Sequence, residues 1–433
     1  MSTHLERITK LARENRETQF LSIAHYITPE ALNEAFKALR KDAAAGIDGI
    51  SHSEYQKNAN EKIQKLHESI SSGRYRTQPL KRIYIPKEDG KQRPISIPCL
   101  EDKIVQKAAT TLLNAIYEVD FHKCSYGFRP GRSQHDALNE VFRRNRRGQV
   151  GWIIECDIQG YFDAIVRNKL MEMIERRIKD GSILRLIGKW INVGAIDEGR
   201  LLISETGTGQ GQVISPLLAN IYLHYVLDEW FESEVKPRLK GEAHEVRFAD
   251  DFILFFQHKE DAERVMAVLG KRFAKYGLTL HPEKTRLFEF GPKALEESEK
   301  PGGKPLATFD FLGLTHVATR SRRGDFMVHV RTMKKRLKRS IKAARDWCKL
   351  HRHDALVEQQ KNLNTKLRGH YQYYGRPTNY LAIKRFYRLV LCTWKNQLNR
   401  RTRGKTVTWQ KFDKILARYP LELPRIKHPW PTW

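Results

Sequence analysis

Cysteine is scarce in this chain and is never paired in the sequence. Five cysteines occur in 433 residues, without a Cys-x-x-Cys pair or a Cys/His cluster at zinc-ligand spacing. That pattern excludes a disulfide framework and argues against an appended zinc-stapled nuclease module. We therefore expect reduced, mostly buried thiols at Cys99, Cys124, Cys156, Cys348 and Cys392.

Long apolar runs are also missing. No stretch reaches the roughly 18 residues of a spanning helix, and the N-terminus from Met1 to Glu6 has no apolar segment that would direct export. We therefore expect no membrane partner and a cytoplasmic location.

Negative charge is underrepresented. Lysine and arginine total 78 against 50 aspartates and glutamates, which gives a net charge of +28 and a pI near 9.9. A basic surface without a partner is the plain alternative, but such an excess destabilises the compact state through self-repulsion. The balance therefore favours a polyanionic partner such as nucleic acid.

The length predicts two or three coupled domains. Short β-branched runs mix with helical segments up to about Asp310, whereas from about Val328 the pattern is helical and basic. Between Met333 and Trp347, apolar residues recur at helical spacing and cationic residues fall mostly elsewhere. A mixed body followed by a basic helical region fits this change.

The segment from His244 to Phe256 reads HEVRFADDFILFF, with two β-prone runs around a pair of aspartates. It predicts a hairpin with Asp250 and Asp251 at its turn. Aspartates are common in turns for local hydrogen-bonding reasons. Here, however, adjacent carboxylates between apolar strands repel each other, and a bound divalent cation usually compensates such repulsion.

A second acidic candidate ends an apolar run upstream. The segment from Val150 to Ile165 reads VGWIIECDIQGYFDAI, so a strand is expected to deliver Asp157 to its C-terminal edge. Two-metal phosphoryl transfer needs carboxylates from separate elements to hold two Mg²⁺ ions. Together with the hairpin pair, Asp157 supplies that set.

These segments resemble the polymerase motifs of bacterial group II intron reverse transcriptases. The resemblance spans nearly the entire chain, and its further blocks are AGIDGIS (45–51), IYIPKEDGKQRPISIP (83–98), SYGFRPGRSQHDAL (125–138), GTGQGQVISPLLANIYLHYVLDEWF (207–231), GLTLHPEKT (277–285) and FDFLGL (309–314). It implies an α+β right-hand fold: an N-terminal extension and fingers in 1–145, a palm with an antiparallel sheet in 146–318, and a helical thumb or maturase domain in 319–433.

The resemblance also implies roles for single residues. Lys87 and Arg93 are similar to the pair that grips the nucleotide triphosphate, Phe162 to the aromatic that excludes a 2′-hydroxyl, and Gln210 to the glutamine at the nucleotide and template. Lys284 is similar to the lysine that protonates pyrophosphate. By residue type alone, such cations are ordinary surface groups and such a phenylalanine packs a core.

Three positions depart from the family pattern. Phe248 replaces the usual tyrosine before Ala-Asp-Asp, Gly209 replaces a proline, and Gln212 replaces the second glycine of that turn. We expect activity to survive the loss of the phenol. The two turn substitutions are expected to alter turn stiffness and to place a side chain near the nucleotide pocket.

The segment from Leu363 to Arg401 resembles the family's thumb, and aromatic residues interleave with arginines there. Such residues can stack on unpaired bases and contact phosphates, although core packing is the alternative for part of the rings. Candidate RNA-binding residues are Arg368, Tyr371, Tyr373, Tyr374, Arg376 and Arg385.

The resemblance implies an RNA-directed DNA polymerase that uses two Mg²⁺ ions, with Mn²⁺ as a substitute, to join dNTPs to a primer on an RNA template. It also implies binding of intron RNA with assistance to splicing, retrohoming into a DNA target, and a nucleoid association in bacteria. We expect no endonuclease domain. The alternatives are a domesticated relative in repair or phage defence, and a non-catalytic RNA-binding splicing cofactor.

Overall fold

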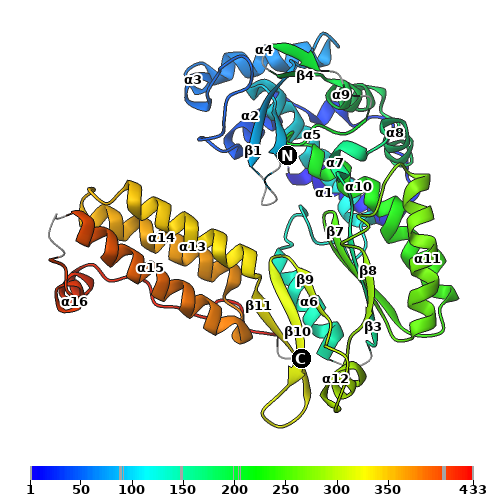
Figure 1. Cartoon of the computed structure of the whole chain (residues 1–433). Coiled ribbons are helices and arrows are strands. Elements are labelled where there is room, and N and C mark those ends of the chain that lie inside the picture. The colour runs from blue at the N-terminus through cyan, green and yellow to red at the C-terminus, as the bar shows by residue number, and fades with distance from the viewer. Residues whose placement is uncertain are drawn as a thin grey trace. The chain divides into compact units, whose positions relative to one another are not determined.

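The computed structural model describes residues 2–86, 90, 92–146, 150–197, 199–202, 204, 206–401 and 406–431. The chain divides into two compact units (Figure 1). Unit 1 comprises 1–133, 154–254 and 260–286, and unit 2 comprises 134–153, 255–259 and 287–433. Among the described residues, no helix has the length and apolar character needed to cross a membrane.

Unit 1 contains helices and a sheet whose strands pair both parallel and antiparallel. Its helices are α1 (Ser2–Glu14), η1 (Ala24–Tyr26), α2 (Pro29–Ala38), α3 (His52–Gln56), α4 (Ala59–Ser71), α5 (Leu100–Asp120), α7 (Tyr161–Ala164), α8 (Arg167–Glu175), α9 (Gly181–Asn192), α10 (Ser215–Leu223), η2 (His224–Asp228), η3 (Phe231–Val235), η4 (Lys236–Arg238) and α11 (Lys259–Lys275). Its first sheet has the order β2-β1-β4-β5, from β1 (Leu80–Pro86), β2 (Gln92–Ile97), β4 (Ala195–Asp197) and β5 (Arg200–Leu202).

A second sheet carries the predicted catalytic segments. It has the order β6-β7-β3-β8, formed by β3 (Trp152–Asp157), β6 (Ala243–Phe248), β7 (Asp251–Phe256) and β8 (Arg286–Glu289). Strand β7 is buried from Phe252 to Phe256, as expected for a central strand with both faces covered. The predicted hairpin and the predicted strand ending at Asp157 are both confirmed as local structure.

Helix α5 forms the apolar centre of unit 1. Thirteen of its residues are buried, among them Ile104, Leu113 and Tyr117. Apolar side chains occur around most of its circumference, which is typical of a helix enclosed by others. The N-terminus of α9 is set by Asp180, whose carboxylate accepts from the N–H groups of Ser182 at 2.8 Å and Ile183 at 3.2 Å.

Unit 2 contains a three-stranded antiparallel sheet and a group of long helices. The sheet has the order β11-β10-β9, from β9 (Thr308–Phe311), β10 (Leu314–Arg320) and β11 (Phe326–Thr332). Its helices are α6 (Gln134–Arg146), α12 (Pro292–Glu299), α13 (Lys334–Leu350), α14 (Leu356–Tyr374), η5 (Pro377–Asn379), α15 (Tyr380–Arg401) and α16 (Trp409–Arg418). Helices α13, α14 and α15 lie side by side (Figure 1).

The structure confirms mixed helix and strand content with antiparallel sheets. One boundary was wrong: the basic helical region begins at Lys334 rather than near Val328, because β11 pairs with β10 as far as Thr332. Four cysteines are buried, Cys392 is exposed, and all five are free thiols.

Candidate active site

The hairpin turn and the end of β3 bring two aspartates together. Asp157 is the last residue of β3 and Asp250 lies in the turn before β7. Burial raises the pKa of Asp250 above its usual value, and the negative charge of Asp157 raises it further. Two facing carboxylates that repel each other are what a divalent cation compensates, and carboxylate oxygens are the ligands that Mg²⁺ prefers.

The third aspartate and a lysine lie at the same end of strands β3 and β7. Asp251 is the first residue of β7 and is partly buried. The Lys284 ammonium lies 3.0 Å from Oδ2 of Asp157. Its loop is fixed by backbone pairing, since the His281 N–H donates to the Asp157 carbonyl at 2.8 Å. The four residues predicted to be catalytic therefore lie around the end of β3 and the adjoining start of β7.

Arg93 belongs to the same neighbourhood. It lies on β2 opposite Ile85 of β1, and its positive charge lowers the pKa of Asp250 against the larger effects of burial and Asp157. The other predicted triphosphate ligand, Lys87, lies outside the described residues.

Phe162 and Gln210 are linked through backbone contacts. The left-handed Gly160 (φ 56°) turns the chain from β3 into α7, where Phe162 is half-buried. The Thr208 N–H donates to the Phe162 carbonyl at 3.1 Å, and the Gln210 carbonyl accepts from the Ser96 N–H at 2.7 Å. The turn that bears Gln210 thus connects α7 with β2.

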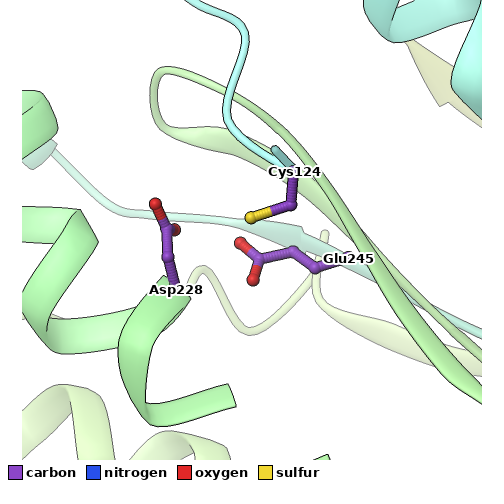
Figure 2. Close-up of side chains that lie close together, drawn as sticks. All are labelled: Cys124, Asp228 and Glu245. Atoms are coloured by element: carbon purple, nitrogen blue, oxygen red, sulfur yellow. The ribbon is translucent and has the colours of Figure 1, made fainter. Parts of the chain in front are cut away.

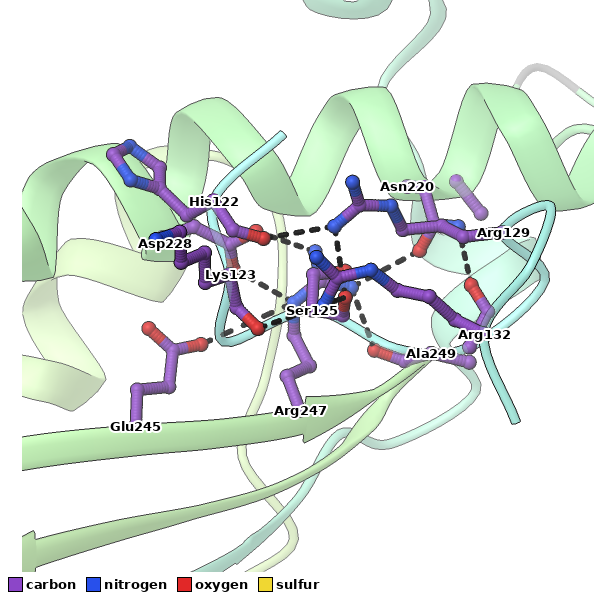
Figure 3. A network of polar contacts seen from close by, with 12 residues as sticks. His122, Lys123, Ser125, Arg129, Arg132, Asn220, Asp228, Glu245, Arg247 and Ala249 are labelled. Atoms are coloured by element: carbon purple, nitrogen blue, oxygen red, sulfur yellow. Dashed lines mark hydrogen bonds and ion pairs between the residues drawn. The ribbon is translucent and has the colours of Figure 1, made fainter. Parts of the chain in front are cut away.

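The turn that bears Asp250 is supported by a buried arginine that the sequence analysis did not single out. Ala249 adopts φ 58°, a left-handed conformation that is uncommon for residues other than glycine. The fully buried Arg247 donates to the Ala249 carbonyl at 3.0 Å and to Asn220 Oδ1 at 3.1 Å, while Asn220 donates to the Gly127 carbonyl at 2.7 Å. Figure 3 shows how these contacts meet beneath the turn.

Arg247 pairs most closely with Asp228. Its Nε and Nη2 atoms donate to Asp228 at 2.7 Å and 2.5 Å. Glu245 Oε1 lies farther away, at 3.9 Å from Arg247 Nε. Burial and the negative charge of Asp228 raise the pKa of Glu245 well above its usual value.

Within the described part of the chain, one group of three His, Cys, Asp or Glu side chains has ligand atoms that all lie within 4.8 Å of one another: Cys124, Asp228 and Glu245 (Figure 2). The aspartates of the candidate active site do not meet that spacing in this structure. Burial also raises the pKa of the Cys124 thiol, which keeps it protonated. Because both Asp228 oxygens already accept hydrogen bonds from Arg247, we assign no metal to this group.

The structure corrects part of the RNA-binding prediction. Tyr371, Tyr374 and Arg376 are 1%, 8% and 0% exposed, so their side chains pack inside unit 2 instead of facing a ligand. Arg376 donates to Asn139 Oδ1 at 2.7 Å and to the His135 carbonyl at 2.9 Å. The expectation for three other candidates stays a prediction: Arg368 and Arg385 are exposed, and Tyr373 is half-buried.

Gln212 was also expected in the wrong place. Its side chain is 4% exposed and points into the interior, where it hydrogen-bonds to Gln106 instead of facing a ligand. Phe248 is half-buried, and its ring centre lies 6.4 Å from that of Phe128. Arg247, Asn220, Asp228 and Gln106 carry no sequence signal of their own, because buried polar partners are defined only by tertiary contacts.

Comparisons with known proteins show to which family this chain belongs. The reverse transcriptase (RNA-dependent DNA polymerase) family model matches residues 85–316, which include the hairpin, Asp157 and Lys284. The group II intron-encoded protein LtrA of Lactococcus lactis subsp. cremoris is 35% identical over 285 residues, covering 65% of this chain and 47% of LtrA.

Two further relatives extend the comparison. Protein YkfC of Escherichia coli K12 is 37% identical over 259 residues, covering 52% of this chain and 68% of YkfC. Nuclear intron maturase 4, mitochondrial, of Arabidopsis thaliana is 24% identical over 220 residues, covering 49% of this chain and 26% of that protein. This chain thus spans about half the length of LtrA and two thirds of YkfC. It belongs to the reverse transcriptase (RNA-dependent DNA polymerase) family.

Proposed function

We propose that this protein is an RNA-directed DNA polymerase that extends a DNA primer on an RNA template. The observation that carries the proposal is the electrostatic interaction of Asp157 with Asp250 across the ends of neighbouring strands, with the positive charge of Arg93 acting on Asp250 as well. Carboxylates from separate elements beside a cation are what nucleotidyl transfer requires.

Asp157 and Asp250, supported by Asp251, would hold two Mg²⁺ ions. Bound there, the ions would stabilise the charge that develops on the attacking and leaving oxygens. The donor set fits this role, because the raised pKa of Asp250 reflects burial and a neighbouring negative charge that a cation would offset.

The remaining residues bind and orient the nucleotide. Arg93, with Lys87, grips the triphosphate, since a guanidinium supplies a bidentate fork and an ammonium a point charge. Phe162 lies beneath the sugar, where a 2′-hydroxyl would clash, and Gln210 contacts the nucleotide and template. Lys284, already beside Asp157, donates a proton to the pyrophosphate as it leaves.

We further propose right-hand fingers, palm and thumb over 1–145, 146–318 and 319–433. The net charge of +28 suits a template–primer duplex, intron RNA and a DNA target. The names of LtrA and of nuclear intron maturase 4 support a role in intron splicing and mobility. A domesticated relative would share the polymerase and lack the intron RNA partner.

Primer extension tests the polymerase. Parent protein, Asp250→Ala and the control Asp346→Ala are compared on poly(rA)/oligo(dT) with dTTP and Mg²⁺, where Asp346 is an exposed aspartate of α13. Synthesis by the parent and the control, lost in Asp250→Ala, is the expected result. A folded parent that binds RNA and synthesises nothing would instead indicate a non-catalytic splicing cofactor.

A further inference from the structure

The turn 207–213 lies directly against strand β2. The Ser96 N–H of β2 donates to the Gln210 carbonyl at 2.7 Å. A Cβ atom on Gly211 would lie 2.7 Å from the Ser96 carbonyl oxygen, so the two backbones touch and only glycine fits there. The turn that bears Gln210 is therefore docked on the strand that bears Arg93.

Two buried glutamines hold this turn from its inner side. Gln212 Nε2 donates to the carbonyls of Trp190 at 3.0 Å and Thr208 at 3.1 Å, and its Oε1 accepts from Gln106 Nε2 at 2.8 Å. Gln106 Oε1 in turn accepts from the Val213 N–H at 2.9 Å. Gln106 is 0% exposed and Gln212 is 4% exposed, so these bonds form without competition from water.

Gly209 and Gln212 depend on each other. Gly209 has φ 63°, and a Cβ atom there would lie 2.6 Å from Gln212 Nε2. That nitrogen is held by two carbonyls and has no freedom to swing aside. A proline at 209 is excluded as well, because its ring fixes φ near −65°. The two departures from the family pattern are thus one coupled feature.

We propose that Gln106 and Gln212 form an amide clamp that positions the turn 207–213 against β2, and that Gly209 is the residue the clamp requires at the top of the turn. The clamp sets the spacing between Gln210 and Arg93. Its effect on nucleotide binding rests on the proposed polymerase function, whereas the clamp itself does not.

Amide hydrogen exchange tests the clamp without any activity. Gln212→Met keeps the side-chain volume and removes the hydrogen bonds. The control is Gln359→Met in α14: Gln359 is 2% exposed, donates to the Arg352 and Asp354 carbonyls, and accepts from Trp394 Nε1.

In Gln212→Met, exchange of the Ser96 and Val213 amides should speed up by roughly tenfold or more, because both are held through the turn. In Gln359→Met it should stay unchanged. Unchanged protection of both amides in Gln212→Met would overturn the clamp.

A double-mutant cycle in thermal unfolding tests the coupling. Gly209→Ala should lower the Tm clearly in the parent and much less in the Gln212→Gly background, where the clash is gone and only the positive φ remains unfavourable. Equal Tm shifts in the two backgrounds would show that Gly209 and Gln212 are independent.

The consequence for nucleotide binding is measured separately. Gln212→Met should raise KM for dTTP by roughly tenfold with a smaller change in kcat, since the turn bears Gln210, which is proposed to bind the nucleotide and not to take part in the chemical step. Gln359→Met should leave KM unchanged. Altered exchange with unaltered KM would mean that the clamp stabilises the turn without affecting nucleotide binding. An inactive parent protein would refute the proposed polymerase function, and the exchange and unfolding results would still test the clamp.

Discussion

The Lys284 ammonium lies 3.0 Å from Oδ2 of Asp157, and both side chains are largely accessible, at 60% and 44% exposure. An exposed ion pair of this kind contributes between zero and about 1 kcal/mol to stability. This contact therefore adds little to the fold, and the role that we propose for Lys284 is proton donation to pyrophosphate.

Replacing Lys284 should separate activity from stability. Lys284→Ala is expected to lower kcat by roughly a hundredfold, the range of general acid catalysis, and to shift the unfolding free energy by less than about 1 kcal/mol. Single-turnover primer extension and urea unfolding measure the two effects. Lys10→Ala, which removes another exposed pair, with Glu14, is the control and should change neither. Undiminished kcat in Lys284→Ala would rule out the proton-donor role.

The buried Arg247–Asp228 pair should be costly to break. Asp228→Asn removes the buried carboxylate to which Arg247 Nε and Nη2 donate, for which about 3–5 kcal/mol of lost stability is expected. Urea unfolding measures this loss, with Asp42→Asn as the control because the Arg40–Asp42 pair is fully exposed and should contribute nothing measurable. Equal behaviour of the two variants would mean that the turn at Ala249 does not depend on this pair.

Acid should destabilise unit 2 through His316. Burial lowers the pKa of His316 to about 3, so the unfolded chain takes up a proton near the ordinary value of 6.5 while the folded chain does not. Above about pH 6.5 the ring is neutral in both states and His316 does not affect the free energy of unfolding. As the pH falls from there toward 3, protonation of the unfolded chain lowers the free energy of unfolding. From pH 7 to 5 the loss from this group is about 2 kcal/mol.

The variant His316→Phe isolates that contribution. It retains a ring against Phe309, whose centre lies 4.5 Å from that of His316, and it has no titrating nitrogen. Its unfolding free energy should fall about 2 kcal/mol less than the parent's between pH 7 and 5. Measurement at pH 8, where both rings are neutral, supplies the baseline for packing changes. Parallel pH curves would show that His316 does not titrate as its burial implies.

Two arginines predicted to bind RNA should now behave differently. Arg376→Gln is expected to cost about 2–4 kcal/mol of stability, because Arg376 is buried and donates to Asn139 and His135. Arg385→Gln, on the exposed face of α15, should leave stability unchanged. It should reduce the slope of log affinity for RNA against log salt concentration by about 1, the loss of one phosphate contact. Unfolding and RNA titrations at several salt concentrations test both, and the reverse pattern would contradict the structure-based assignment.

Phe162 should control the choice of sugar. Phe162→Ala is expected to admit rNTPs at roughly tenfold or greater relative efficiency, since the ring would no longer exclude the 2′-hydroxyl. Competition between dTTP and UTP on the same template measures the ratio. Phe288→Ala, which removes a ring from β8, is the matched control for general loosening. Sugar selection that stays as in the parent would leave Phe162 as core packing.

By itself, the sequence determined the parts that depend on local pattern. Two β-prone runs around the aspartate pair predicted the hairpin, and an apolar run ending in Asp157 predicted a strand with a carboxylate at its end. Strand propensity and turn chemistry act over a few residues, so both could be predicted locally. The excess of positive charge needed no structure either.

Tertiary structure alone decided which polar groups are enclosed. Nothing in the local pattern distinguishes Arg376, which is buried, from Arg385, which is exposed, and nothing marks Gln106 as the partner of Gln212 across 106 residues of chain. The physical reason is that a buried polar side chain is stable only where donors and acceptors from distant segments meet it, and such meetings exist only once the chain has folded.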